Sequence, residues 1–328
     1  MKKILIPDRL KNNPELEDKI FGNGYQVIAL NKNDAKQISD EIWKSVDAIL
    51  AWHELNYDSE LISKLHNCKV IVRIGVGFDN VDLDAANNKD IVVCNVPDYG
   101  TNDVADHAMA LLLGFYRGTI AYDKEIRCNR TWDWDSIPAL NRLSGSTLGI
   151  IGMGRIGLAL SIRARAFGLI VNYYDPYLPH GIDKIFGYQR HVNLFDMIKS
   201  CDCISFHTPL TTKTFQMAND EFFSNIKKGS VVINTARGEI ISIDSLYKAM
   251  KDNVVKAAGL DVLEDEPPDY KNPLISAWSK QEDWLKDRLI ITPHAAFYNR
   301  ESFHEMREKA ALEAKRVLEG HAPYNRVN

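Results

Sequence analysis

The amino-acid sequence predicts an α/β protein with two doubly wound parallel-sheet domains. A length of 328 residues suggests two domains, because a domain has about 150 residues on average. Short runs rich in valine and isoleucine alternate with helix-length segments, which is typical of buried parallel strands in βαβ units. One long helical segment and the irregular stretch WDWD (132–135) interrupt this alternation. The interruption predicts that the strands form two separate series.

The first series comprises predicted strands at 2–7, 26–30, 47–51, 69–74 and 90–94. These runs are short and continuously apolar, so we expect helices to cover both faces of their sheet. The segment 101–118 follows and is typical of one long helix, with Thr101 or Asn102 as its cap and acidic residues in its first turn.

The second series comprises predicted strands at 147–152, 169–174, 202–206, 230–234, 255–262 and 288–292. A final helix is predicted over 301–318, which is rich in alanine, glutamate, lysine and arginine. This helix could return to the first domain and leave the second as an insertion within it. Periodicity alone leaves that choice open.

Charge and hydropathy exclude several classes of protein. The 40 basic and 44 acidic residues give a net charge of −4, so no basic field indicates nucleic acid or an acidic membrane as a partner. The chain has no apolar run of the roughly 18 residues that a membrane helix needs, and its start has too short an apolar run for a signal peptide.

The cysteines indicate a reducing compartment. They are odd in number, scattered and without a CxxC pair, which argues against a zinc site or a disulfide framework. We therefore expect free thiols, a cytoplasmic protein and no bound metal. The five are Cys68, Cys94, Cys128, Cys201 and Cys203.

A glycine-rich turn in the second series predicts a dinucleotide site. The stretch GIIGMGRIG (149–157) places GxGxxG at Gly152, Gly154 and Gly157, directly after a predicted strand and at the start of a helical run. The first glycine permits the tight turn, the second lets the backbone approach a pyrophosphate, and the third lets helix pack close to strand. The N-terminus of the helix then offers N–H groups to the phosphates.

Asp175 strengthens this interpretation. It ends the next strand, 18 residues after Gly157, close to the offset of about 20 residues at which an acid binds the adenosine ribose. A carboxylate there repels a 2′-phosphate, and no arginine follows in DPYLP (175–179), so NAD is favoured over NADP. The alternative is a glycine-rich turn followed by an ordinary Asp-Pro turn.

Three ionisable residues follow later strands, at the sheet edge where open α/β folds bind ligands: Arg237, Glu266 and His294. An arginine can bind a carboxylate and polarise the adjacent carbonyl, and a histidine can donate a proton as hydride arrives. A glutamate beside that histidine would favour its charged form and fix its tautomer. These roles suit reduction of a 2-oxo acid. Each residue alone is also compatible with a surface ion pair or a cap.

The sequence resembles the D-isomer-specific 2-hydroxyacid dehydrogenase family from about Val70 to Leu318. The resemblance implies a Rossmann cofactor domain at 101–297, inserted in a flavodoxin-like substrate domain at 1–100 and 298–328. It also implies NAD as cofactor. The stretches that carry it are RIGVGFDNVD (73–82), NVPDYGTNDVADHA (95–108), GIIGMGRIG (149–157), YYDPY (173–177), HTPLTTKT (207–214), NTARGE (234–239), GLDVLEDEP (259–267) and TPHAAFY (292–298).

The resemblance also implies roles for single residues. Arg237 would bind substrate, His294 would be the acid/base and Glu266 its partner. Backbone N–H groups of Val76 and Gly77 would bind the substrate carboxylate, although a simple strand-to-helix turn is the alternative. Tyr99 would lie on the substrate side of the cleft or only pack there. Cofactor contacts are implied for Gly152, Gly154, Arg155, Ile156, Gly157, Asp175, Thr208, Pro209, Thr235, Ala236 and Asp261; for Asp261 the alternative is a strand-end acid that caps backbone.

Within the family, the stretch 294–318, together with FDNVDL (78–83) and VCNVPDYGTNDVADHA (93–108), favours the branch that includes the C-terminal-binding protein corepressors. Phe297 departs from their pattern, which has tryptophan shortly after the histidine. An NAD(H)-responsive protein-binding module is therefore the competing function. The absence of a long tail, of basic patches and of low-complexity sequence favours an enzyme acting on a small 2-oxo or 2-hydroxy acid. The WDWD stretch resembles the family's arm at the dimer interface, and exposed paired tryptophans would otherwise be costly, so we expect a homodimer.

Overall fold

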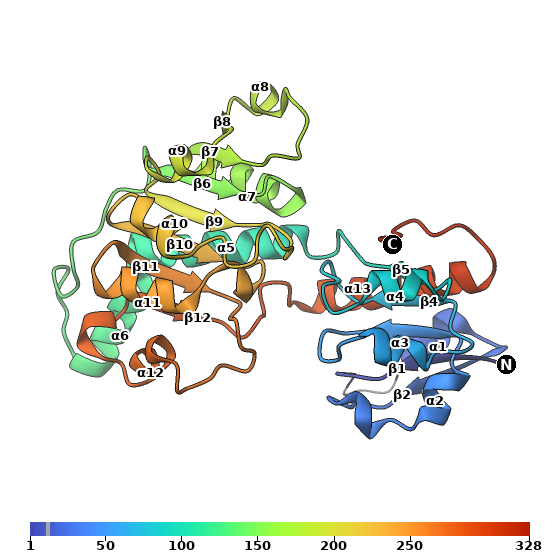
Figure 1. Cartoon of the computed structure of the whole chain (residues 1–328). Coiled ribbons are helices and arrows are strands. Elements are labelled where there is room, and N and C mark those ends of the chain that lie inside the picture. Colours follow the sequence, from blue (N-terminus) through green and yellow to red (C-terminus); the bar gives the residue numbers. More distant parts are fainter. Residues whose placement is uncertain (11–13) are drawn as a thin grey trace. The chain divides into compact units, whose positions relative to one another are not determined.

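The computed structural model describes residues 1–10 and 14–328, which divide into two compact units. The first unit comprises Met1–Gly100 and Tyr298–Asn328, and the second comprises Thr101–Phe297. Each unit has its own parallel sheet (Figure 1). None of the helices in the described ranges is long and apolar enough to cross a membrane.

The first unit has a five-stranded sheet in the order β2-β1-β3-β4-β5, the flavodoxin-like order. Helices α2, α3 and α4 cover one face, where Trp43 and Ile62 are buried, and α13 packs against β3, β4 and α1. The strands are β1 (Lys2–Ile6), β2 (Tyr25–Ala29), β3 (Ala48–Ala51), β4 (Val70–Arg73) and β5 (Val92–Cys94); the helices are α1 (Glu15–Phe21), η1 (Ala35–Gln37), α2 (Asp40–Ser45), α3 (Ser59–Ser63), α4 (Leu83–Asn87) and α13 (Arg300–Leu318).

The second unit has a seven-stranded parallel sheet in the order β12-β11-β10-β9-β6-β7-β8. From β8 to β11 this is the Rossmann order, with the strand order reversing between β6 and β9. The strands are β6 (Thr147–Ile151), β7 (Ile170–Tyr174), β8 (Gln189–His191), β9 (Cys203–Phe206), β10 (Ser230–Asn234), β11 (Val255–Leu260) and β12 (Leu289–Ile291).

Helices cover both faces of this sheet. One core joins α5 and α7 to the strands, and the other joins them to α9, α10, α11 and α12. Successive strand residues alternate between the two cores, as Ile150 and Ile151 of β6 do. The helices are α5 (Thr101–Arg117), α6 (Thr119–Asn129), α7 (Arg155–Ala166), α8 (Ile182–Phe186), α9 (Leu194–Ile198), α10 (Asp220–Asn225), η2 (Gly238–Ile240), α11 (Ile243–Lys251), α12 (Pro273–Ser279) and η3 (Asp283–Leu285).

The fold confirms the predicted class, two doubly wound parallel sheets. The last helix, α13, lies in the first unit. All eleven predicted strands are present. Among the elements of the second unit that sequence analysis did not locate are the short edge strand β8 and helix α6.

Candidate active site

The glycine turn between β6 and α7 has the conformation that its sequence requires. Gly152 adopts φ +89°, and a Cβ there would lie 2.7 Å from the carbonyl oxygen of His207. A Cβ on Gly157 would lie 2.2 Å from the carbonyl oxygen of Gly152, so only glycine lets α7 start this close to the turn. Gly154 has no atom within 4 Å of its would-be Cβ, which leaves open space beside the start of α7.

Asp175, at the end of β7, lies against this turn. One oxygen of its carboxylate accepts a hydrogen bond from Met153 N at 3.0 Å, and the other accepts from Tyr177 N at 2.9 Å. Arg190 of β8 donates to the carbonyl oxygens of Asp175 and Leu178, which fixes the loop after the acid. The acid and the glycines, far apart in sequence, are therefore neighbours at the carboxyl ends of β6 and β7.

The next two strands end in hydroxyls that fit a polar ligand. Thr208 follows β9 and Thr235 follows β10, and the side-chain oxygen of each is buried without a hydrogen-bond partner. Buried polar groups in proteins nearly always have a hydrogen-bond partner, so hydroxyls without one at this sheet edge, beside the glycine turn, fit a polar ligand such as a dinucleotide. Of the other predicted cofactor residues, Arg155 and Pro209 are exposed, and Ile156 and Ala236 are half-buried.

Glu266 and His294 meet at the same edge of the sheet. The distance from His294 Nδ1 to Glu266 Oε2 is 2.7 Å, and Glu266 Oε1 accepts from Leu263 N at 3.0 Å. Each side chain is partly exposed, at 25% for the histidine and 33% for the glutamate. The two residues are 28 positions apart in the sequence, so the fold alone brings them together.

Electrostatics tie Arg237 to this pair. Burial is the largest influence on the Glu266 carboxyl and would raise its pKa. The hydrogen bond and charge of His294, with a contribution from Arg237, outweigh burial and hold the pKa of Glu266 below its ordinary value. The backbone around Arg237 is fixed by Asn234 of β10, whose side chain donates to the Arg237 carbonyl oxygen at 2.8 Å. The arrangement places a guanidinium, a carboxylate and an imidazole at one sheet edge.

Asp261, which we expected to contact the cofactor, is almost completely buried, at 2% exposure. Its carboxylate accepts hydrogen bonds from the hydroxyl of Thr292 and the N–H groups of Ala295 and Ala296, at 2.6–2.9 Å. It therefore binds the loop that carries His294. Sequence analysis assigned no role to Thr292 or to His107. Nε2 of His107, in α5, lies 3.0 Å from Oγ1 of Thr292.

In the first unit, the predicted substrate residues lie at the carboxyl edge of its sheet. Val76 and Gly77 are half-buried in the loop after β4, and Asn95 donates to the carbonyl oxygen of Val76 at 2.7 Å. Tyr99 is half-buried in the segment after β5. Sequence analysis missed Arg73, a buried cation at the end of β4, although a charge inside KVIVRI (69–74) was the visible signal.

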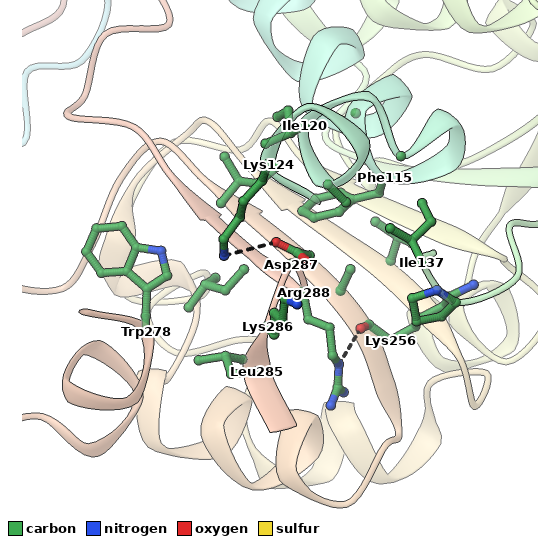
Figure 2. A pocket seen from close by; sticks show the side chains of 18 of the residues that line it. Phe115, Ile120, Lys124, Ile137, Lys256, Trp278, Leu285, Lys286, Asp287 and Arg288 are labelled. Carbon is green, nitrogen blue, oxygen red and sulfur yellow. Dashed lines mark hydrogen bonds and ion pairs between the residues drawn. The ribbon is translucent and has the colours of Figure 1, made fainter. Parts of the chain in front are cut away.

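A cavity lies at the opposite edge of the seven-stranded sheet. It has a volume of about 700 Å³ and lies in the second unit at the amino ends of β9 to β12, the edge opposite to the glycine turn. Figure 2 shows Phe115, Ile120 and Ile137 on one side of it and Trp278 and Leu285 on the other. Among the described residues, no group of three or more histidine, cysteine or acidic side chains could hold a metal ion.

Comparison with known proteins identifies the class. Residues 109–296 match the NAD-binding domain of the D-isomer specific 2-hydroxyacid dehydrogenases. This chain belongs to that family.

Individual relatives agree with this assignment. The chain is 33% identical over 328 residues to D-3-phosphoglycerate dehydrogenase of Methanocaldococcus jannaschii, and 32% identical over 304 residues to C-terminal-binding protein 1 of Caenorhabditis elegans. It spans 60% and 41% of the length of these two curated relatives, and the matches cover 100% and 90% of this chain. The crystal structure of D-lactate dehydrogenase from Aquifex aeolicus, complexed with NAD and lactic acid, matches with a TM-score of 0.83 and 29% identity, covering 97% of this chain and 96% of that one.

Proposed function

We propose that this protein is an NAD-dependent dehydrogenase that interconverts a small 2-oxo acid and the corresponding D-2-hydroxy acid. The observation that carries the proposal is the 2.7 Å contact between Glu266 and His294, at the sheet edge that also holds Arg237 and the glycine turn. Family membership supports the same reaction class, and the curated relatives include a dehydrogenase of this kind.

The residues divide the chemistry between them. Bound NADH supplies the hydride to the carbonyl carbon. His294, whose Nδ1 contacts Glu266, donates a proton from Nε2 to the carbonyl oxygen, so the ketone becomes an alcohol. Arg237 binds the carboxylate and polarises the carbonyl. In the oxidative direction the neutral histidine accepts the same proton.

The first unit is the proposed substrate domain. Backbone N–H groups at Val76 and Gly77 would bind the substrate carboxylate, because a glycine-rich turn can form a concave anion site. The side chain of Asn95 holds the carbonyl oxygen of Val76 and so fixes the orientation of this loop. Tyr99 is a proposed contact of the substrate side chain.

Asp175 is the proposed determinant of NAD over NADP. Its carboxylate would accept from the ribose hydroxyls and repel a 2′-phosphate. Asp175→Ala combined with Tyr177→Arg should raise the ratio of kcat/KM for NADPH to that for NADH by at least about tenfold. Tyr177→Arg alone is the control, since it adds the cation and keeps the carboxylate. Equal use of both cofactors by the unmodified protein would refute the assignment.

A substrate panel tests the activity itself. NADH absorbance is followed with glyoxylate, hydroxypyruvate, pyruvate, phenylpyruvate and 4-methylthio-2-oxobutyrate. We expect turnover with at least one of them. Tight NADH binding without any turnover would favour the second candidate, an NAD(H)-responsive protein-binding module. The similarity to C-terminal-binding protein 1 of Caenorhabditis elegans is the observation that favours that candidate.

We also propose that the protein is a homodimer that pairs through the second unit. Trp132 and Trp134 are 88% and 83% exposed, a large apolar surface for a free monomer. The cavity of about 700 Å³ is lined by the residues that follow them, Ile137 and Pro138. Its lining carries four cations and two acids, although Lys124 is paired with Asp287 and Lys286 with Glu125. The tryptophans alternate with acids in WDWD (132–135), so this segment of a second copy is the proposed occupant. The cations are Lys124, Lys256, Lys286 and Arg288, and the acids Asp202 and Asp287.

A cytoplasmic location is part of the proposal. The five cysteines are all free, and four of them are buried. Free thiols are usual in a reducing compartment.

A further inference from the structure

We propose that Thr292 and His107 are positioning residues for the acid/base His294, acting through the buried carboxylate of Asp261. This inference rests on the proposed role of His294. It assigns a function to a chain of hydrogen bonds that links helix α5 to the loop after β12.

The backbone of His294 has an unfavourable conformation that neighbouring contacts must stabilise. It adopts φ +50°, in the left-handed region that side chains other than glycine rarely occupy. Such conformations persist where surrounding contacts over-determine them, and they concentrate at functional sites. Here the N–H of His294 donates to the carbonyl oxygen of Asp261 at 2.7 Å, which ties the residue to the end of β11.

The carboxylate of Asp261 holds the residues on either side of His294. Oδ1 accepts from Thr292 Oγ1 at 2.6 Å and from Ala295 N at 2.9 Å, and Oδ2 accepts from Ala296 N at 2.9 Å. Charge-assisted hydrogen bonds to a buried carboxylate are among the stronger ones in proteins. One side chain therefore fixes the loop before and after the acid/base.

His107 continues this network from α5. Its Nε2 lies 3.0 Å from Thr292 Oγ1 and 3.6 Å from Asp261 Oδ1. The hydroxyl of Thr292 has one hydrogen, and the 2.6 Å contact assigns that hydrogen to Asp261. His107 must then donate from Nε2, which fixes its tautomer and aligns the hydroxyl with the carboxylate.

The two acids thus have different tasks. Glu266 contacts the ring of His294 at Nδ1, whereas Asp261 contacts the Thr292 hydroxyl and the backbone N–H groups of Ala295 and Ala296, which hold His294 in place. Loss of the Thr292 hydroxyl should therefore lower kcat without moving the pH at which the reductive rate is half lost. A displacement of about 1 Å at a catalytic group can cost on the order of 100-fold in rate.

The first test compares Thr292→Val with Thr292→Ser. The valine has nearly the same shape without the hydroxyl, and we expect kcat to fall about 10- to 100-fold while the dissociation constant of NADH stays within about twofold. The serine restores the hydroxyl and should recover most of kcat. The control is Ser230→Ala, which removes a buried hydroxyl that donates to Cys201 O, at the amino edge of the same sheet. It should destabilise the fold comparably and leave kcat unchanged.

The second test separates positioning from proton transfer at His107. Glutamine can donate from Nε2 but cannot exchange protons near neutral pH, whereas leucine can do neither. Positioning predicts near-normal kcat for His107→Gln and a loss for His107→Leu. Equal losses in both variants, or an unchanged kcat in Thr292→Val, would overturn the inference. If the inference fails in these tests but His294→Gln is inactive in the same assays, the proposed function still stands. If His294→Gln has wild-type turnover, the proposed mechanism itself is wrong.

Discussion

The two edges of the seven-stranded sheet differ in chemistry although the same strands form both. At the carboxyl edge lie the glycine turn, two orphaned threonine hydroxyls and the Glu266–His294 pair. At the amino edge lies the cavity of about 700 Å³, lined largely by aliphatic and aromatic side chains. This cavity is therefore at the edge without the Glu266–His294 pair. An apolar cavity suits a protein surface as well as a small molecule, so it does not by itself indicate a catalytic site.

The largest expected effect is at the carboxyl edge. His294→Gln removes the proton donor but keeps a side chain of similar size that can hydrogen-bond. We expect the reductive kcat to fall by about 10²–10⁴, the usual contribution of general acid–base catalysis. NADH binding, measured by fluorescence titration, should change little, because the glycine turn and Asp175 are unaltered. Wild-type turnover in this variant would show that the carboxyl edge does not act through His294.

Alanine substitutions at two glycines of the turn should have smaller effects than the loss of His294, and the two can be compared directly. A Cβ at Gly154 meets open space, so Gly154→Ala should fold normally and weaken NADH binding about tenfold or more by blocking the approach of the pyrophosphate. A Cβ at Gly157 would lie 2.2 Å from the Gly152 carbonyl oxygen, so Gly157→Ala should lower the melting temperature as well. Thermal unfolding with and without NADH distinguishes the two. Unchanged NADH affinity in Gly154→Ala would argue against a pyrophosphate at this turn.

Glu266→Gln should shift a pH profile rather than abolish activity. The pKa of Glu266 is held below its ordinary value of about 4.5, so the carboxylate keeps its charge throughout the neutral range and does not itself titrate there. That charge lies 2.7 Å from Nδ1 of His294, the proposed acid/base. Removing it should move the fall in reductive rate to lower pH, and the rise in oxidative rate should move with it.

The pH–rate profiles of the wild type and of Glu266→Gln, measured in both directions, check this shift. Superimposable profiles would mean that the carboxylate does not tune the acid. The free energy of unfolding also depends on pH through Glu266. Because the pKa of Glu266 is lower in the folded chain, this group stabilises the fold above its unfolded pKa, and that contribution is lost as pH falls through the lowered value.

The fold was largely predictable because buried parallel strands have a strong signature. Runs such as SVVIN (230–234) have a continuous apolar centre, and each is a strand in the structure. Strand β8 (Gln189–His191) carries no such run, because it is a three-residue edge strand of polar residues. Helix α6 (Thr119–Asn129) was missed because its apolar pattern is weak, and it is separated from α5 by Gly118 in a left-handed conformation.

The site was predictable only where chemistry follows a recognisable motif. The glycines and Asp175 are linked by a known offset, and the structure places them in contact through Met153 N. The network of His107, Asp261 and Thr292 has no local signature, because its members come from α5 and from two strand ends far apart in the sequence. For Asp261, sequence could suggest a cofactor contact, but only the fold reveals the loop that its carboxylate holds.

The smallest effect on turnover is expected for substitutions in the proposed dimer interface of the second unit. Replacing Trp132 and Trp134 together by alanine removes two side chains that are more than four-fifths exposed, so the fold of the monomer should be unaffected. If these tryptophans bind a second copy, the dimer dissociation constant should rise at least about tenfold, because buried aromatic anchors dominate most interfaces. Analytical ultracentrifugation measures that constant. The kcat of each subunit should stay close to wild type, since the variants lie at the opposite sheet edge from His294.

The cavity offers an independent route to the same result. Ala121 is half-buried and lines it, so Ala121→Trp should fill part of the space and weaken the dimer without touching the WDWD segment. Phe167→Ala is the control, because this aromatic is 49% exposed and does not line the cavity. Loss of the dimer in both the tryptophan and the Ala121 variants, but not in the control, would place segment and cavity in one interface. Dimer loss in the tryptophan variant alone would keep the dimer and move its interface away from the cavity. An unchanged dissociation constant in both would remove the amino edge from assembly altogether.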